Sequence, residues 1–235
     1  MLEKQRTQCN KMKHRATTLG VQEYAQHKAY TEWADYHSQQ TPMAVYYDSR
    51  EQHLIEAGKM AKTIGWIAEF GVDAGYTLKI LASEHKGIPV YGFDAWHKKG
   101  PGLPDRWTGN TDFSKAFTWS KKEYMYLKKT MPRNVKLIPG LFDAKKIRAQ
   151  LVGPAQLVHI DCDTGKSTRQ VLDAIQPALV EGTVIVFDEY ANYPGWREHE
   201  FKAWQEFAKQ WEIKYEYLGI SNMDVSIKII TRRYK

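Results

Sequence analysis

Acidic side chains end several apolar runs in this chain, and two glycines follow the first of these runs. The acids at or beside these ends are Glu69, Asp94, Asp161, Asp163, Asp188 and Glu189. Carboxylates accept hydrogen bonds from hydroxyls and amines, and they are ligands that hard divalent cations prefer. Because the carboxyl ends of parallel strands meet at one edge of a sheet, we expect these acids to lie together. Four such strand ends are hard to attribute to helix capping alone.

The glycines stand where the chain changes from strand to helix. The run Ile64–Phe70 predicts a short buried strand, and the apolar residues after Gly75 have helical spacing. Glycine lets the backbone turn sharply and come close to a bound group, and a helix that starts near Thr77 points its free amides at the same place. We therefore expect a nucleotide-like ligand at this turn. The alternative is an ordinary tight turn that binds nothing.

The spacing of Glu69, Gly71 and Gly75 indicates which ligand this is. It reads E-x-G-x-x-x-G, whereas a dinucleotide fold has G-x-G-x-x-G after the strand. The pattern resembles motif I of the class I S-adenosylmethionine-dependent methyltransferases. In that family the loop passes under the methionine part of the cofactor, and the leading acid lies close to its amino group. The resemblance assigns Glu69, Gly71, Gly75 and Thr77 to cofactor binding.

Asp94 ends a second apolar run, Val90–Asp94, 19 residues beyond Gly75. This is about where a ribose-binding acid at the tip of the second strand should fall. An ionised carboxylate accepts hydrogen bonds from both vicinal hydroxyls of a ribose. The alternative is an aspartate that caps a helix. With motif I in register, we favour the ribose role.

The rest of the chain continues the alternation of strands and helices. Further strands are expected at Val135–Gly140, Leu157–Asp163 and Thr183–Tyr190, helices at Ser167–Val180 and Arg197–Trp211, and a final hairpin at Tyr215–Gly219 and Val225–Ile230. This order predicts an α/β fold, a Rossmann-like doubly wound sheet of seven strands that is mostly parallel with one antiparallel strand. The same arrangement is typical of the methyltransferases that motif I resembles.

Length and composition favour one domain with an extension. A chain of 235 residues with 43% hydrophobic content can bury one good core. We expect residues 1–50 to form an N-terminal helical extension, with a helix over Val21–His37, and residues 51–235 to form the methyltransferase domain. An amphipathic helix over Asp48–Lys62 should lead into the first strand. The helical extension could pack against a partner subunit in a homo-oligomer.

The lack of a recognisable targeting signal and the low cysteine content favour a cytoplasmic protein. No apolar run approaches the length of about 18 residues that a membrane span needs, and the N-terminus lacks the apolar segment of a secretory signal. Cys9 and Cys162 are the two cysteines, and they suggest neither a disulfide framework nor a zinc site. We therefore expect a cytoplasmic protein that does not associate with membranes.

The net charge of +7 is unevenly distributed. Residues 1–20 hold five basic residues against Glu3 alone, which gives +4. A second basic cluster consists of Lys115, Lys121, Lys122, Lys128, Lys129, Arg133 and Lys136. Such a cluster can attract a nucleic acid, but lysines four to seven apart on a surface helix are also ordinary, and we favour a solvated helix face.

Several segments in order resemble the macrocin O-methyltransferase group within the class I enzymes. They are Glu-Phe-Gly-Val, Tyr-Gly-Phe-Asp, Leu-Ile-Pro-Gly-Leu-Phe, His-Ile-Asp-Cys-Asp and Gly-Thr-Val-Ile-Val-Phe-Asp-Glu-Tyr, and the match spans roughly residues 50–230. The resemblance implies a divalent cation, held by Asp161 or Asp163 and by Asp188 with Glu189. Mg²⁺ suits such oxygen ligands. The alternative is that Asp161 and Asp163 order the cofactor or cap the next helix.

The general base is less clear from the sequence. The lysine of catechol-type enzymes is replaced by Thr164, and the histidine of the macrocin-like pattern by Phe201, with His199 two residues earlier. Asp188 and His199 remain the candidate catalytic residues. His199 is either the base or a solvated surface histidine.

Three functions remain open. The first is methyl transfer from S-adenosylmethionine to a hydroxyl of a small molecule, a sugar or another natural-product scaffold, with a divalent metal. The second is nucleic-acid methylation, and the third is cofactor binding without methyl transfer. The aromatic segment 95–119 is expected to form a lid or substrate wall beside the cofactor, or a structural cluster.

Overall fold

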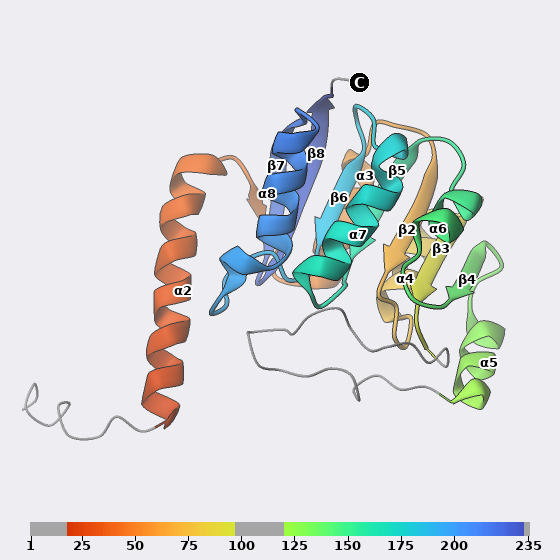
Figure 1. Cartoon of the computed structure of the whole chain (residues 1–235), viewed down its shortest axis with the longest axis horizontal. Helices are drawn as coiled ribbons and strands as arrows, with labels where there is room; N and C mark the ends of the chain where they lie inside the picture. The colour runs from red at the N-terminus through yellow and green to blue at the C-terminus, as the bar shows by residue number, and fades with distance from the viewer. Residues whose placement is uncertain (1–17, 97–119, 233–235) are drawn as a thin grey trace, which may run out of the picture.

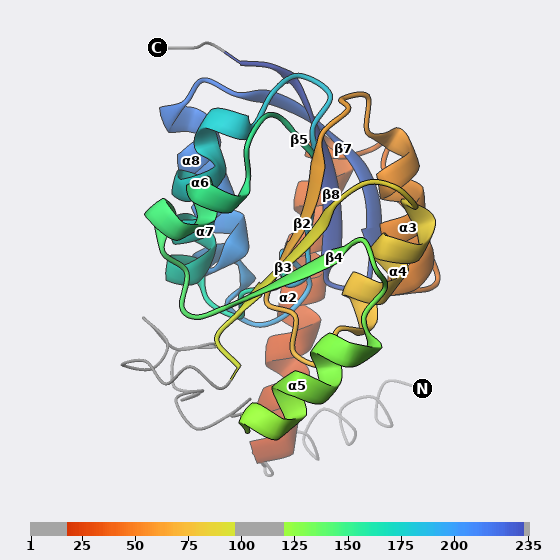
Figure 2. The ribbon, with the colours of Figure 1, turned by 90° about the vertical axis from the view of Figure 1, so that its right-hand side faces the viewer.

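A computed structural model describes residues 18–96 and 120–232 of the chain. These residues form one eight-stranded sheet in the order β1-β7-β8-β6-β5-β2-β3-β4, with helices on both faces (Figures 1 and 2). The strands are β1 (Val45–Tyr46), β2 (Trp66–Phe70), β3 (Val90–Asp94), β4 (Val135–Pro139), β5 (Ala155–Ile160), β6 (Val184–Phe187), β7 (Lys214–Ser221) and β8 (Asp224–Thr231). The helices are α2 (Thr18–Gln40), α3 (Arg50–Met60), α4 (Tyr76–Glu84), α5 (Lys121–Thr130), α6 (Ala144–Gln150), α7 (Gly165–Ile175) and α8 (Glu200–Gln210).

The fold class predicted from the sequence is confirmed. Strand β8 runs antiparallel to both of its neighbours, β6 and β7, and the other strand pairs are parallel. The predicted count of seven strands omits β1, which forms one edge of the sheet and pairs with β7 through Val45 and Tyr46. A strand of two residues is too short to give a periodic signal, so the sequence contained no cue for it.

The central strands are buried on both sides. Helices α3 and α4 lie on one face, and α6, α7 and α8 lie on the other (Figure 2). Every residue of β2 and β6 is buried. This explains why these strands read as continuous apolar runs, because a parallel strand between two helical layers has no solvent face.

Two helices differ from their predicted bounds for local reasons. The helix expected over Ser167–Val180 stops at Ile175, and a 3₁₀ turn follows, with a proline among its first residues. Proline lacks the amide that would continue the helical hydrogen bonds. The helix expected over Arg197–Trp211 consists of a 3₁₀ turn, Trp196–Glu198, and then α8.

Helix α2 is longer than predicted and is attached to the sheet by aromatic contacts. Trp33 is 6% exposed and packs edge-on against Trp196, with 5.4 Å between the ring centroids. The hydroxyl of Tyr36 lies 2.8 Å from that of Tyr217 on β7. Among the described residues, no helix combines the length and apolar character that crossing a membrane requires. The basic tail before residue 18 and most of the expected lid, residues 97–119, lie outside the described residues.

Candidate active site

The ends of neighbouring strands lie in one row. The amide of Asp161, just after β5, donates to the carbonyl of Phe70 at the end of β2, at 2.8 Å. In the same way, the amide of Asp188, just after β6, donates to Ile160 at 3.0 Å. The carboxyl ends of the parallel strands form the lower edge of the sheet in Figure 1. The sheet therefore gathers the candidate residues at the edge where open α/β sheets bind ligands.

The loop between β2 and α4 has glycine at two left-handed positions, and the need for glycine is strictest at Gly71, where a Cβ would meet backbone atoms. Gly71 and Gly75 have φ angles of 88° and 73°, in the left-handed region. A Cβ on Gly71 would lie 1.6 Å from the carbonyl oxygen of Asp161, and one on Gly75 would lie 2.1 Å from the terminal methyl of Met131. Helix α4 begins after Gly75 without a side-chain cap, so no side-chain cap competes with a ligand for the amides of its first turn.

Asp94 holds this loop in place from the end of β3. Its Oδ2 accepts hydrogen bonds from the amides of Val72 and Asp73, both at 2.8 Å. Its Oδ1 accepts from the amide of Trp96 at 3.2 Å. A carboxylate has about four lone-pair positions, and three of those of Asp94 are used by the loop and Trp96, so one position on Oδ1 remains for a ligand.

Glu69 lies beneath the glycine loop, where it is fully buried. One of its oxygens accepts a hydrogen bond from the hydroxyl of Thr77, and the same oxygen shares a hydrogen bond of 2.8 Å with Nδ1 of His159. Burial raises the pKa of Glu69 to about 8, and burial also lowers the pKa of His159 to about 4. Glu69, Thr77 and His159 thus form an internal support for the loop.

Two groups of side chains are close enough to share a cation. His159, Asp161 and Asp188 form one group, and Asp161, Asp163 and Glu189 form the other; within each group the ligand atoms lie within 4.8 Å of one another. Burial, together with the charge of Asp161, raises the pKa of Asp163 to about 7. Asp163 also has a φ of 57°, which is uncommon for a residue other than glycine.

Arg50, from the first turn of α3, reaches into the first of these groups. Its Nη2 lies 3.0 Å from Oδ2 of Asp161 and also pairs with Oδ1 of Asp188, while its Nε lies 3.7 Å from Asp224. Burial alone would lower the pKa of Arg50, but the charges of Asp161 and Asp224 outweigh it and raise the pKa. Arg50 therefore stays charged. It neutralises part of the acidic edge, which is the edge of the sheet that carries Asp161, Asp163, Asp188, Glu189 and Asp224.

Glu189 is connected to helix α8 through Glu200. The amide of Glu189 donates to one oxygen of Glu200 at 2.9 Å, and Thr168 on α7 donates to the other oxygen at 3.2 Å. Burial and the neighbouring charge of Glu200 raise the pKa of Glu189 above its ordinary value. Oε2 of Glu189 is buried and has no hydrogen-bond partner among the residues that the structure describes. Such an orphaned acceptor is the kind of group that a cation would satisfy.

His199 is 7% exposed, so the alternative of a solvated surface histidine is wrong. It stands just before α8 with φ −109° and ψ −126°, outside the helix, because a 3₁₀ turn ends there. Its ring lies 6.0 Å from that of Tyr193, and its backbone packs close to Gly165 at the start of α7. His199 belongs to neither of the two groups of side chains that are close enough to share a cation.

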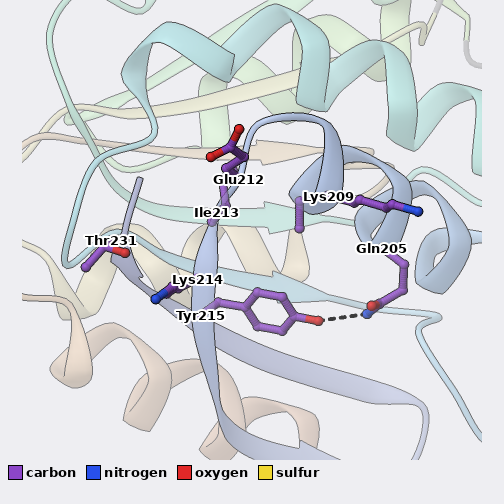
Figure 3. A pocket seen from close by; sticks show the side chains of 8 residues that line it. Gln205, Lys209, Glu212, Ile213, Lys214, Tyr215 and Thr231 are labelled. Carbon is purple, nitrogen blue, oxygen red and sulfur yellow. Dashed lines mark hydrogen bonds between the residues drawn. The ribbon is translucent and has the colours of Figure 1, made fainter. Parts of the chain in front are cut away.

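A hollow elsewhere on the molecule does not coincide with these residues. It has a volume of ≈ 420 Å³ and is lined by Gln205, Ala208, Lys209, Glu212, Ile213, Lys214, Tyr215 and Thr231 (Figure 3). Lys214 begins β7 and Thr231 ends β8, so the hollow lies at the edge of the sheet opposite to the acids.

Four residues of the acidic edge were not identified from the sequence: Arg50, His159, Glu200 and Asp224. The positions of two of them could have been inferred from the strand pairing. His159 is the direct cross-strand neighbour of Glu69, and Asp224 begins the antiparallel strand, which therefore starts at the edge where the parallel strands end. Arg50 and Glu200 lie on helices and gave no such signal.

Comparison with known proteins identifies the family to which the chain belongs. Residues 68–190 match a family described as a methyltransferase domain. No curated protein matches the sequence. Among solved structures, the calicheamicin methyltransferase CalS11 is similar, with a TM-score of 0.58 and 21% identity over 77% of this chain and 80% of CalS11. The O-methyltransferase NovP is similar with a TM-score of 0.59 and 19% identity over 78% of this chain and 80% of NovP. These likenesses show the fold.

Proposed function

Because the chain belongs to the methyltransferase domain family, we propose that it transfers the methyl group of S-adenosylmethionine to a hydroxyl of a small molecule. The observation that carries this proposal is the row of acids beside the glycine loop at one sheet edge. The loop suits a cofactor with an amino acid and a ribose, and the acids suit an acceptor hydroxyl.

The cofactor would lie across the ends of β2, β3 and β5. Gly71 and Gly75 let the backbone approach its methionine part, and Asp94 would accept a hydrogen bond from its ribose through Oδ1. Glu69 and Thr77 would act from beneath the loop, because Glu69 is fully buried and bonded to Thr77. Asp161, at the end of the central strand β5, would face the cofactor and the acceptor together.

A sugar or another natural-product scaffold is the acceptor class that we favour. CalS11 is described as a TDP-rhamnose 3′-O-methyltransferase of calicheamicin biosynthesis, and NovP as an O-methyltransferase. Both share the fold of this chain at about one fifth sequence identity. Substrate does not follow from fold, so the acceptor is a proposal that rests on the site.

A divalent cation such as Mg²⁺ fits the acids of this edge. Asp161, Asp163 and Glu189 offer three hard oxygen ligands within 4.8 Å of one another, and Oε2 of Glu189 is buried without a hydrogen-bond partner in the described part of the chain. When bound, the ion would supply Lewis-acid polarisation that lowers the pKa of an acceptor hydroxyl. Asp188 lies beside these ligands, at the end of β6.

The acceptor proton requires a base, and His199 is our candidate. Asp188 is paired with Arg50, and a carboxylate next to a guanidinium is a weak base. His199 is buried and directly precedes Glu200, which contacts Glu189.

The proposal is tested by incubating the protein with S-adenosylmethionine, labelled in its methyl group, and a panel of nucleotide sugars, free sugars and phenols. Parallel samples contain EDTA or excess Mg²⁺, and another contains RNA and DNA. We expect label in a hydroxylated small molecule and a lower rate in EDTA. Label in nucleic acid alone would establish the alternative that the basic residues suggest. Binding of cofactor without any transfer across a broad panel would favour a binding protein.

A further inference from the structure

One long side of the sheet is only partly closed. Strand β1 consists of two residues, and within residues 18–96 and 120–232 it covers β7 only at Gly219 and Ile220. The first residues of β7, 214–217, pair with β8 alone among the strands that the structure describes. We call this segment the β7 edge. Helix α2 lies on the same side of the sheet and reaches the last residue of the segment, because the hydroxyls of Tyr36 and Tyr217 are 2.8 Å apart (Figure 1).

The backbone of the β7 edge presents hydrogen-bonding groups to the outside. Tyr215 stands opposite Ile229 of β8. Ile229 turns away from β7, since its amide donates to Thr183 at 2.9 Å and its carbonyl accepts from Gly182 at 2.8 Å. In an antiparallel ladder, the two residues of such a pair both point their backbone groups outward. Tyr215 therefore offers one donor and one acceptor, and neither has a backbone partner in the described part of the chain.

Two side chains of the β7 edge carry opposite charges. Strand geometry puts Lys214 and Glu216 on one face and Tyr215 and Tyr217 on the other. Lys214 is exposed, and the side chain of Glu216 is 49% exposed although one of its oxygens pairs with Lys228 at 2.6 Å. Lys214 and Tyr215 also line the hollow of Figure 3. This part of the sheet is therefore accessible from outside.

The order of the two charges makes the β7 edge complementary to itself. When two copies pair antiparallel about a two-fold axis at Tyr215, Lys214 of each copy stands opposite Glu216 of the other. Glu216 has a second oxygen for this contact, beside the one that Lys228 holds. A parallel pairing in register would instead place lysine beside lysine and glutamate beside glutamate. The charges thus favour a closed dimer over open-ended addition of strands.

Strand β1 does not block this arrangement. In the antiparallel register, Gly219 and Ile220, which carry β1, stand opposite Trp211 and Gln210 of the other copy. These two residues belong to the end of α8 and its cap, and β7 starts only at Lys214. Strand β1 therefore lies beyond the end of the other copy's β7 and does not compete with it for hydrogen bonds.

We propose that the β7 edge is the interface of a homodimer, in which two copies of this chain join their sheets antiparallel through Tyr215 and two pairs of Lys214 with Glu216. The backbone hydrogen bonds supply attraction, and the charge pairs set direction and register. Lys214 begins β7 at the end of the sheet opposite to the acids, so the dimer leaves both acidic edges open. The inference does not depend on the proposed function.

The test is the mass of the full-length protein in sedimentation velocity at about 5–200 µM. We expect a dimer with a dissociation constant in the micromolar range, because a short strand edge buries less area than an obligate interface. Lys214→Glu turns both charge pairs into repulsions and should weaken the dimer by ~30-fold or more, and Glu216→Lys should do the same. Lys122→Glu is the matched control, since it makes the same charge change at an exposed position of the distant helix α5 and should leave the dimer unchanged.

Mixing the two charge variants tests the register itself. One copy with Lys214→Glu and one with Glu216→Lys restore both opposite-charge pairs between them. We expect the equimolar mixture to dimerise at concentrations where each variant alone is monomeric, with melting temperatures showing beforehand that each variant is folded. A wild type that stays monomeric over the whole range would overturn the inference. A dimer that survives Lys214→Glu, or a mixture that does not associate, would overturn it as well.

Discussion

Asp94 has two roles in this account: it holds the glycine loop through hydrogen bonds, and it would bind the ribose of the cofactor. Substitutions can separate these roles. Its Oδ2 accepts two backbone hydrogen bonds from the glycine loop, at 2.8 Å each. A hydrogen bond to a charged group contributes about 1.5–3 kcal/mol net, and the lower half applies because Asp94 is partly exposed. Asp94→Ala removes two such bonds and should therefore reduce the free energy of unfolding by about 3–4.5 kcal/mol. At roughly 2–4 °C per kcal/mol for a chain of this size, Tm should fall by about 6–18 °C.

Asp94→Asn should behave differently. The amide oxygen can still accept from Val72 and Asp73, so Tm should fall by only about a quarter as much. The assay is thermal unfolding by circular dichroism, with titration of S-adenosylhomocysteine by calorimetry. Glu206→Ala, which removes an exposed acid of α8, is the control. If Asp94→Ala melts like the wild type, the hydrogen bonds to the loop do not stabilise it, and our reasoning about this residue is refuted.

Three further predictions concern the buried support, the base and the N-terminal helix. Burial raises the pKa of Glu69 to about 8, so its contribution to stability is present below the unfolded pKa of about 4.5 and is lost as the pH rises through 8. Glu69→Gln should flatten the pH dependence of Tm in that window, and an unchanged slope would contradict this assignment. His199→Ala should lower the turnover number by ~100-fold while leaving cofactor affinity unchanged, and an undiminished rate would remove it as the base. Trp33→Ala should cost about 3 kcal/mol in unfolding free energy because it empties a buried ring site, whereas exposed Tyr24→Ala should cost almost nothing; equal effects would mean that α2 is not anchored through Trp33.

The sequence predicted the architecture because the parallel strands are apolar runs separated by clear turn signals. Glu69, Gly71 and Gly75 marked the central turn, and Asp94 marked the next strand end at the expected spacing. Strand order then follows from the fold class, which brings the ends of β3, β2, β5 and β6 together without any side-chain information. The acidic edge was therefore accessible to reasoning from sequence.

What could not be predicted depends on helix placement. Arg50 lies at a helix start that looks like any other, and its contacts with Asp161 and Asp188 arise only when α3 packs beside the strand ends. Similarly, the environment of His199 is set by a 3₁₀ turn that a helical pattern does not reveal. Glu69 was expected to face the cofactor, and its complete burial depends on packing against His159. Local patterns cannot report contacts between residues that lie 90 or more positions apart in the chain.

The most direct test of the central claim is equilibrium binding of S-adenosylhomocysteine to the wild type and to Gly71→Ala, measured by calorimetry. A Cβ at residue 71 would lie 1.6 Å from the carbonyl oxygen of Asp161 in a backbone with positive φ, so the loop must move. We predict binding in the micromolar range to the wild type and at least ~30-fold weaker binding to a variant that still folds. Absence of binding to the wild type, or equal binding to both proteins, would contradict the claim that this loop holds the cofactor.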